Sequence, residues 1–358
     1  MTRRPDALRD LDRFSALIGR DPEQVQAAGG NTSVKADDVL WVKASGLWLA
    51  DALERDVFVP VRLGEVLDGI ARGLADPVGA AVVAELNPEG LRPSIETTLH
   101  ALLPHAVVVH THSVRTIALA IREDAETLLA ERLGGLHWLY VPYCKPGLPL
   151  TQVISERWRG GPPVDVIVLG NHGLVVGGAT VEAAAALLAD VERRLDAPAQ
   201  PAPAGDPTLL AATAAASGLR EARHAAAHGV ATYPIRAAWA TAGSLYPDHA
   251  IFLGPGATEL PAGGDRGPGR AAAEAAERGS KLFVVPGAGV LLPPDATSSA
   301  DELALCLALV LERVPGDARL RYLTAEHEAE LLDWDAEKYR QSLARAPGSF
   351  HPPTGRPR

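Results

Sequence analysis

The sequence has 358 residues, more than most single domains contain, so we expect two domains. Apolar residues make up 47% and charged residues 22%, as in ordinary globular proteins, and the net charge of −10 argues against a nucleic-acid partner, which needs a basic face. Only two cysteines occur, which fits a reducing cytoplasm. The sequence has no apolar leader and no apolar run that approaches about 18 residues, so we expect neither a signal peptide nor a membrane span.

Periodicity and turn residues divide the first half of the chain into alternating helices and strands. In chain order we expect a helix over 5–28, strands around a tight turn over 29–50, an extended piece and helix over 57–74, a helix over 93–103, a strand over 106–112, a helix over 113–133, two strands over 164–176 and a helix over 181–195. Ser94 is the expected N-cap of the fourth of these elements.

A Pro/Ala-rich stretch, APAQPAPAGDP over 197–207, indicates a linker. It would separate a first domain over 1–196 from a C-terminal α/β domain over 208–345. The polar, Pro-rich residues over 346–358 predict a flexible tail.

The second domain contains a faint echo of the first. LFVVPGAGVLL over 282–292 lines up with VIVLGNHGLVV over 166–176, and an Ala/Leu-rich helix follows each segment. In this alignment Ala288 stands where His172 stands, so a degenerate copy would leave the metal chemistry to the first domain. A generic strand–turn–strand could give the same pattern.

Three histidines predict a metal site. His110 and His112 lie two residues apart on an expected strand, so both imidazoles point to one face, and His172 lies in a Gly-flanked turn. Three imidazoles leave one coordination position open, as in catalytic zinc sites, and Glu96 could act beside it as an acid/base. Alone, each residue has a simpler interpretation: a turn histidine, or a carboxylate that complements a helix dipole.

Other candidate residues are weaker. His224 and His228 in HAAAH share a helical face but lack an adjacent acid of the metalloprotease type, so a solvated helix face is expected. His249 has nothing near it in sequence that completes a site. Cys144 has no adjacent histidine and is expected to be a bystander thiol rather than a nucleophile.

Two small-residue turns, 29–33 and 44–46, are flanked by Lys35 and Lys43. Successive backbone N–H groups in such turns form anion cradles, and hydroxyls and ammonium groups add donors. Ser94 at a helix N-terminus would be a third contributor. Together these segments predict a phosphate site, although each could be a plain hairpin turn.

In this order, the pieces resemble the class II aldolase/adducin family. The matching motifs are GGNTSVK, LWVKASG, PSIETTLH, VVVHTHS, VPYCKPG and VLGNHGLVV. The second region, with YPDHAIFLGPG, KLFVVPGAGV and LLDWDAEKYR, is similar to the extension of a longer branch, which includes the aldolase part of bifunctional rhamnulose-1-phosphate aldolase/dehydrogenase proteins. The resemblance implies a three-layer α/β/α domain around a mainly antiparallel sheet, with a second smaller α/β domain, in a homo-oligomer such as a tetramer.

Carried over by motif, the resemblance implies roles for particular residues. They are His110, His112 and His172 as ligands of zinc or another divalent transition metal, Glu96 as catalytic acid/base, Tyr143 as a catalytic residue reaching a neighbouring subunit, and Asn31, Ser45, Gly46 and Ser94 as phosphate contacts. Short members often have two hydroxyl residues before the glutamate, whereas Ile95 stands here, so one phosphate contact is lost and Lys35 or Lys43 could compensate.

The implied function is that of a metal-dependent aldolase in the cytoplasm. It would cleave a ketose 1-phosphate, or a related sugar, to dihydroxyacetone phosphate and an aldehyde through a metal-stabilised enediolate. A sugar-phosphate epimerase, a dehydratase and a decarboxylase would use the same metal site. A non-catalytic scaffold of the adducin kind is a further alternative, and its mark would be the loss of the histidines.

Overall fold

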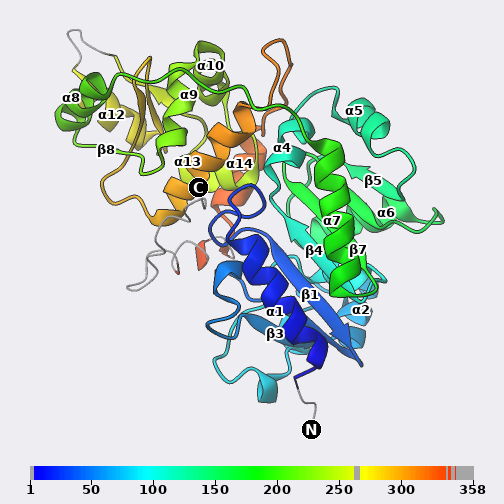
Figure 1. Cartoon of the computed structure of the whole chain (residues 1–358). Coiled ribbons are helices and arrows are strands. Elements are labelled where there is room, and N and C mark those ends of the chain that lie inside the picture. Colours follow the sequence, from blue (N-terminus) through cyan, green and yellow to red (C-terminus); the bar gives the residue numbers. More distant parts are fainter. Residues whose placement is uncertain (1–3, 262–266, 336–337, 340–342, 344–358) are drawn as a thin grey trace. The chain divides into compact units, whose positions relative to one another are not determined.

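The computed structural model describes residues 4–261, 267–335, 338, 339 and 343 of the chain. These residues fall into two compact units (Figure 1). The first comprises described residues within 1–116 and 126–196, and the second those within 117–125 and from 197 onward. The tail predicted over 346–358 lies outside the described residues.

Seven strands of the described chain form the sheet of the first unit. They are β1 (Asn31–Ala36), β2 (Val39–Lys43), β3 (Phe58–Arg62), β4 (Val107–Thr111), β5 (Trp138–Val141), β6 (Val166–Leu169) and β7 (Gly173–Gly178). Their order is β3-β2-β1-β4-β7-β6-β5, and every neighbouring pair is antiparallel except β5 and β6. The predicted mainly antiparallel sheet is thus confirmed.

Helices cover both faces of this sheet. The helices before residue 197 are α1 (Asp6–Gly19), α2 (Leu63–Ala71), α3 (Thr97–Leu102), α4 (Val114–Ala120), α5 (Ala125–Arg132), α6 (Leu148–Trp158) and α7 (Val181–Leu195). α1 and α7 pack on one face, where α7 crosses in front of β4 and β7 in Figure 1. α2, α3 and α6 pack on the other, so the predicted three-layer α/β/α arrangement is confirmed.

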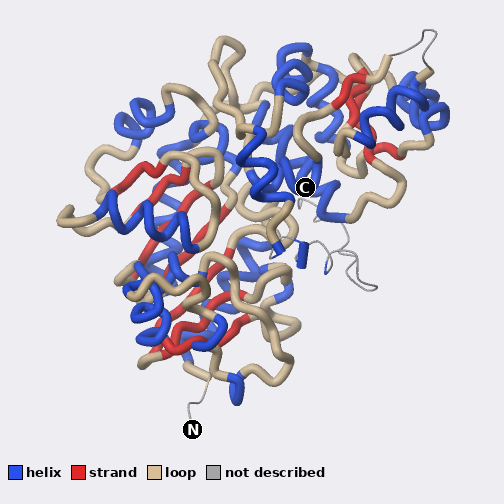
Figure 2. The backbone as a smooth tube through the Cα atoms, turned by 180° about the vertical axis from the view of Figure 1, so that it is seen from behind, coloured by secondary structure: helices blue, strands red, loops and turns tan. Residues whose placement is uncertain are grey.

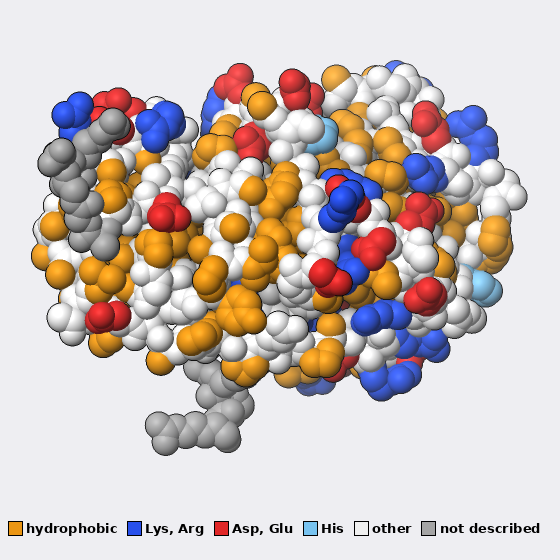
Figure 3. All heavy atoms as spheres, turned by 90° about the horizontal axis from the view of Figure 1, so that it is seen from above, with side chains coloured by type: hydrophobic (Ala, Val, Ile, Leu, Met, Phe, Trp, Pro, Cys, Tyr) orange, Lys and Arg blue, Asp and Glu red, His pale blue; other side chains and the backbone are white. Residues whose placement is uncertain are grey.

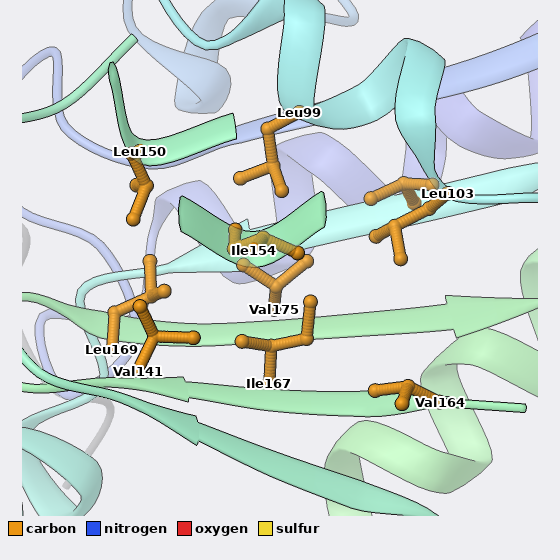
Figure 4. Close-up of a cluster of buried hydrophobic side chains, with 10 residues drawn as sticks. Leu99, Leu103, Val141, Leu150, Ile154, Val164, Ile167, Leu169 and Val175 are labelled. Atoms are coloured by element: carbon orange, nitrogen blue, oxygen red, sulfur yellow. The ribbon is translucent and has the colours of Figure 1, made fainter. Parts of the chain in front are cut away.

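Apolar side chains join α3 and α6 to the sheet (Figure 4). Leu99 from α3 and Ile154 from α6 lie over Ile167 of β6 and Val175 of β7, and all four are buried. Burying a side chain of this size stabilises a fold by roughly 1.5–3 kcal/mol. The cluster therefore fixes α3, and with it the turn that carries Glu96, against the sheet.

β4 is the central strand, paired with β1 on one side and β7 on the other. With helices on both faces, all its residues are buried, which explains the unbroken valine run at its start. Val108 belongs to the cluster under α3 and α6. Because side chains alternate along a strand, His110 and then His112 point to that same face.

The second unit has its own four-stranded sheet in its described part, drawn in red with the larger sheet in Figure 2. Its strands are β8 (Arg220–Glu221), β9 (Thr258–Glu259), β10 (Phe283–Val285) and β11 (Gly289–Leu292). Its helices are α8 (Pro207–Ser217), α9 (Gly229–Thr232), α10 (Pro234–Ala242), α11 (Pro247–Leu253), α12 (Pro268–Glu277), α13 (Ser298–Leu311) and α14 (Ala325–Leu332).

The two sheets share a pattern of pairing. The order β8-β11-β10-β9 matches β4-β7-β6-β5, with two antiparallel pairs followed by one parallel pair in each. A helix lies between the parallel strands, α12 in one sheet and α6 in the other, and a long helix follows the last strand, α13 or α7. In this correspondence Gly289 matches Gly173, and Ala288 matches His172.

The Pro/Ala-rich segment before α8 is hydrogen-bonded within the second unit. The Gln200 N–H donates to the Glu312 carbonyl at 2.7 Å, and the Asp206 N–H donates to the Gly287 carbonyl at 3.0 Å. The Asp206 side chain then accepts from two N–H groups in the first turn of α8. The domain boundaries drawn from the sequence stay a prediction.

Two expected helices differ from the structure. The first helix ends at Gly19, shortly before Pro22, rather than at residue 28. The helix expected over 113–133 is interrupted, because Ile121 and Glu123 pair through their backbones with the segment around Leu320. The backbone groups of this stretch are therefore satisfied outside a helix.

Ser94 is not the N-cap that the sequence predicts, because α3 begins three residues later and its N-cap is Glu96. The Ser94 carbonyl accepts from the Thr97 N–H at 3.1 Å, and its hydroxyl accepts from the Glu96 N–H at 3.2 Å. Ser94 therefore opens a turn, which sets Glu96 at a bend between strand-like and helical backbone.

In the part of the chain that the structure describes, no helix combines the length and apolar character needed to cross a membrane. Neither Cys144 nor Cys306 forms a disulfide. On the face shown in Figure 3, Lys and Arg side chains are interspersed with Asp and Glu.

Candidate metal centre

His110, His112 and His172 converge on one point. One potential ligand atom from each lies within 4.8 Å of the others, and all three side chains are buried. The ring centroids are 5.1, 4.9 and 5.2 Å apart, so the rings form a nearly equilateral triangle. Among the described residues this is the only group of three or more such side chains that could hold a metal ion.

Strand pairing brings His172 to the other two. β4 and β7 are antiparallel with His110 opposite Val175, so the turn before β7 lies beside the end of β4. A Cβ on Gly173 would lie 2.3 Å from the Thr111 carbonyl oxygen, which explains why only glycine fits there. Asn171 has φ of 54°, a conformation that asparagine tolerates better than most residues.

A backbone contact orients the His110 imidazole. Nδ1 lies 3.0 Å from the Leu174 carbonyl oxygen, which can only accept a hydrogen bond. Nδ1 therefore carries the hydrogen, and the lone pair is on Nε2, which points toward Glu96 and the other rings. Metal-ligating histidines are commonly fixed in this way through their second nitrogen.

Glu96 lies beside the three histidines and is 4% exposed. Its Oε2 is 3.3 Å from His110 Nε2, and its Oε1 is 3.6 Å from His172 Nε2. The Asn31 amide donates to Oε2 at 2.9 Å. Burial raises the pKa of Glu96, but the nearby histidines and the Asn31 amide outweigh it and hold that pKa at about 2.

Sequence reasoning missed His100. It is fully buried, one helical turn after Glu96, and hydrogen-bonds Asn31 and Ser33. Its signal in the sequence was the four-residue spacing from Glu96 in PSIETTLH, which places both on one side of a helical turn.

Two of the expected anion-binding segments lie side by side. The Ser94 N–H donates to the Lys43 carbonyl at 2.9 Å, and the Ser45 N–H donates to the Arg92 carbonyl at 2.8 Å. Gly46 has φ of 78° and turns the chain beside them. The structure thus brings Ser45, Gly46 and Ser94 together, as a shared phosphate site requires.

The two lysines are engaged with backbone carbonyls. Lys43 donates to the carbonyls of Ala28 at 2.7 Å and Gly30 at 3.0 Å, and so braces the turn before β1. Lys35 donates to the carbonyls of Ala101 and Leu103 at the end of α3, and burial lowers its pKa to about 8. Phosphate contacts by either lysine stay predictions, and the position of Lys35 favours a role as a helix cap.

Gly29 leaves room for the His112 imidazole. A Cβ at this position would lie 2.7 Å from His112 Nδ1, so the small residue permits the imidazole to reach its place.

Tyr143 is half-buried in the segment between β5 and α6, and its backbone nitrogen lies close to Gly170. Its expected action in a neighbouring subunit stays a prediction.

The competing histidines do not form a site. The expected solvated helix face of HAAAH is wrong, because the segment is a short 3₁₀ turn, with both histidines partly buried. His224 bonds Glu302 at 2.8 Å, and His228 Nδ1 accepts from the Val290 N–H at 3.2 Å. His249 is fully buried, and its Nδ1 accepts from the Leu245 N–H.

Comparison with known families identifies the part of the chain that carries these histidines. The profile of the class II aldolase and adducin N-terminal domain matches residues 15–197, which include every predicted site residue. The chain belongs to this family. Its N-terminal part is therefore a class II aldolase/adducin domain.

Proteins that are similar in sequence to this class II aldolase/adducin chain are named for different activities. An uncharacterized oxidoreductase of Bacillus subtilis, YuxG, is 32% identical over 193 residues, which are 50% of this chain and 27% of that protein. The L-fuculose phosphate aldolase of Methanococcus vannielii is 27% identical over 188 residues, 48% of this chain and 86% of that protein. The chain thus spans only about a quarter of the Bacillus protein.

Among solved structures, the N-terminal class II aldolase domain of a conserved protein from Thermoplasma acidophilum is similar. It is 29% identical, with a TM-score of 0.46, and the match covers 55% of this chain and 94% of that one.

Proposed function

We propose that this chain is a metal-dependent aldolase that cleaves a ketose 1-phosphate to dihydroxyacetone phosphate and an aldehyde. The observation that carries the proposal is the buried Glu96 carboxylate, 3.3 and 3.6 Å from two of three histidines that could share one cation. Two archaeal relatives bear the name L-fuculose phosphate aldolase, which supports a sugar-phosphate substrate.

The donor set fits a divalent transition metal, and we propose zinc. Three imidazoles bind zinc well and leave a position for a substrate oxygen. His110, with its Nδ1–H on a backbone carbonyl, presents the lone pair that a ligand requires. When bound, the cation supplies Lewis-acid stabilisation of the negative charge that develops on the ketose oxygens.

Glu96 and Tyr143 would handle the protons. As the C–C bond breaks, its electron pair stays with the ketose fragment, and the adjacent hydroxyl loses its proton to leave an aldehyde. Tyr143, supplied by a neighbouring subunit of a homo-oligomer, would accept that hydroxyl proton as a phenolate and release it to water. Glu96, a carboxylate in the resting site, would take up a proton from water and pass it to the carbon, completing dihydroxyacetone phosphate.

Ser45, Gly46 and Ser94 would hold the substrate phosphate. Their segments are joined by backbone hydrogen bonds, and backbone N–H groups and hydroxyls suit phosphate oxygens. Lys35 is left out of this site, because its ammonium caps the end of α3.

Replacing Glu96 by Gln tests the proposal. Gln keeps the size of the side chain but cannot exchange a proton, so we expect turnover to fall by about 10²–10⁴-fold with metal content unchanged. Turnover is measured with ketose 1-phosphates in an assay coupled to released dihydroxyacetone phosphate, and metal by elemental analysis.

A matched control is Glu85→Gln, an exposed carboxylate of the same unit, which should leave turnover unchanged. Full activity in Glu96→Gln would remove this residue from the acid/base role. A purified wild-type protein that folds but binds no metal would instead point to a scaffold.

We further propose that the second unit is a degenerate copy of the β4–α7 half of the first. The shared strand order and pairing senses support this. In the copy, Glu221 and Arg223 stand where His110 and His112 stand, and Ala288 replaces His172. The copy therefore lacks the imidazole ligands, and we assign metal chemistry to the first unit alone.

A further inference from the structure

His100 is a buried histidine beside the metal centre for which the proposed function has no role. Its backbone N–H donates to the Glu96 carbonyl at 3.2 Å, one turn back along the chain. Its side chain has no exposed surface. A buried imidazole that is not a ligand needs a partner for each ring nitrogen.

Both partners lie on β1. His100 Nδ1 is 2.7 Å from the Ser33 hydroxyl oxygen, and Nε2 hydrogen-bonds the Asn31 side-chain oxygen. Residues two apart on a strand point to the same face, so β1 presents both side chains to the imidazole together. The ring is thus held at two points.

The Glu96 carboxylate fixes the direction of each hydrogen bond in the series Glu96–Asn31–His100–Ser33. A carboxylate only accepts, so the Asn31 group 2.9 Å from Glu96 Oε2 is the amide nitrogen, which donates. Asn31 Oδ1 then faces His100 and accepts from Nε2–H, while Nδ1 accepts from the Ser33 hydroxyl. Burial favours this neutral ring, since it lowers the pKa of His100 to about 3.

This series of hydrogen bonds gives the two Glu96 oxygens different surroundings. Oε2 accepts from Asn31, whereas Oε1 accepts no hydrogen bond from the residues that the structure describes. An Asn31 amide turned by half a rotation would set its oxygen against the carboxylate. His100 opposes that rotation, because its N–H would lose its acceptor.

We propose that His100 is a positioning residue that acts through Asn31 to hold the Glu96 carboxylate in its reactive orientation, with Ser33 fixing the imidazole tautomer. The proposal rests on the acid/base role proposed for Glu96. It gives Asn31 a role other than the phosphate contact implied by the family resemblance, because both ends of its amide are engaged inside the protein.

Two substitutions of His100 test the role. His100→Leu removes the donor to Asn31, whereas His100→Gln keeps an amide N–H that can replace it. We expect His100→Leu to lower kcat by about 10–100-fold, as a small misplacement of a catalytic group does, with KM changed less than about threefold. His100→Gln should recover most of that loss, and both variants should keep the metal content of the wild type.

Thr98→Val is the matched control. Thr98 lies on α3 with His100, and this substitution removes its buried 2.7 Å hydrogen bond to Thr151 of α6 without touching Asn31. Its kcat should stay near that of the wild type. Equal losses in Thr98→Val and His100→Leu would mean that packing of α3 alone matters, and a His100→Gln variant no better than His100→Leu would equally overturn the proposal.

A spectroscopic measurement separates this inference from the proposed function. Nitrogen-15 spectra of labelled histidines in the metal-free protein should show His100 neutral with its hydrogen on Nε2, and Ser33→Ala should shift the Nδ1 signal. A charged ring or an Nδ1–H ring in the wild type overturns the proposal, even if His100→Leu fails to fold. Lack of aldolase activity would overturn the role of Glu96. The spectrum would still show whether His100 makes the hydrogen bonds to Asn31 and Ser33 that the proposal requires.

Discussion

Two buried histidines of the first unit, His100 and His110, differ in what their ring nitrogens contact. His110 Nδ1 donates a hydrogen bond to a backbone carbonyl and its Nε2 points into the site, so Nε2 can ligate a cation. His100 has both nitrogens engaged with side chains and cannot do so without breaking them. His112 and His172 complete the triangle with His110. The neighbours of each ring, rather than the residue type, decide its role.

His172→Ala should therefore strongly weaken metal binding. Loss of one of three protein ligands is expected to weaken zinc affinity by at least about 100-fold, more than loss of an outer-shell partner does. The measurement is zinc titration by calorimetry. His105→Ala, which removes a partly buried histidine bound to Asp165, should bind zinc like the wild type. Unchanged affinity in His172→Ala would exclude this residue as a ligand.

At the scale of elements, the approach of the β6–β7 turn to the end of β4 builds the site. Thr111 is paired with Leu174, so its carbonyl cannot move away from Gly173 without disturbing the sheet. The glycine is required by space and not by an unusual φ.

Gly173→Ala should consequently destabilise the first unit by about 1–3 kcal/mol, the usual effect of an overpacked core, and weaken zinc binding. The free energy of unfolding is measured by urea denaturation. Gly134→Ala is the control, since its Cβ would meet only ordinary contacts at 3.7 and 3.8 Å. Equal stability of the two variants would show that the strand end yields to the extra methyl group.

At the scale of the whole molecule, the second unit has a pH-sensitive pair of its own. Its hydrogen bond to Glu302 raises the pKa of His224 above 6.5, although burial opposes it, and Asp301 adds to the rise. For His228 burial is the main cause and lowers the pKa. The two histidines therefore couple folding to protons with opposite signs.

A raised folded-state pKa gives stability that is full below the unfolded pKa and is lost as pH rises through the folded value. The stability difference between the wild type and His224→Gln should thus be larger at about pH 5.5 than at about pH 8.5. For His228→Gln the difference should change in the opposite direction. Thermal denaturation in both buffers measures this, and a shared sign would contradict the assigned pKa shifts.

The sequence by itself determined the family, the three-layer domain and the three histidines that the fold brings together. Strand valines before His110, two histidines at a spacing of two and a Gly-flanked His172 are local patterns, and each follows from how one segment folds. Patterns of this kind can be recognised without knowing which segments touch.

Tertiary structure decided what the remaining polar residues do. Lys35 and Lys43 carry the charge that a phosphate site needs, yet their ammonium groups lie on backbone carbonyls. His100 and Asn31 are 69 residues apart and meet only because β1 pairs beside β4 and α3 packs over them. A buried polar side chain takes the partner that the packed fold places within hydrogen-bond distance, and that partner comes from a distant segment.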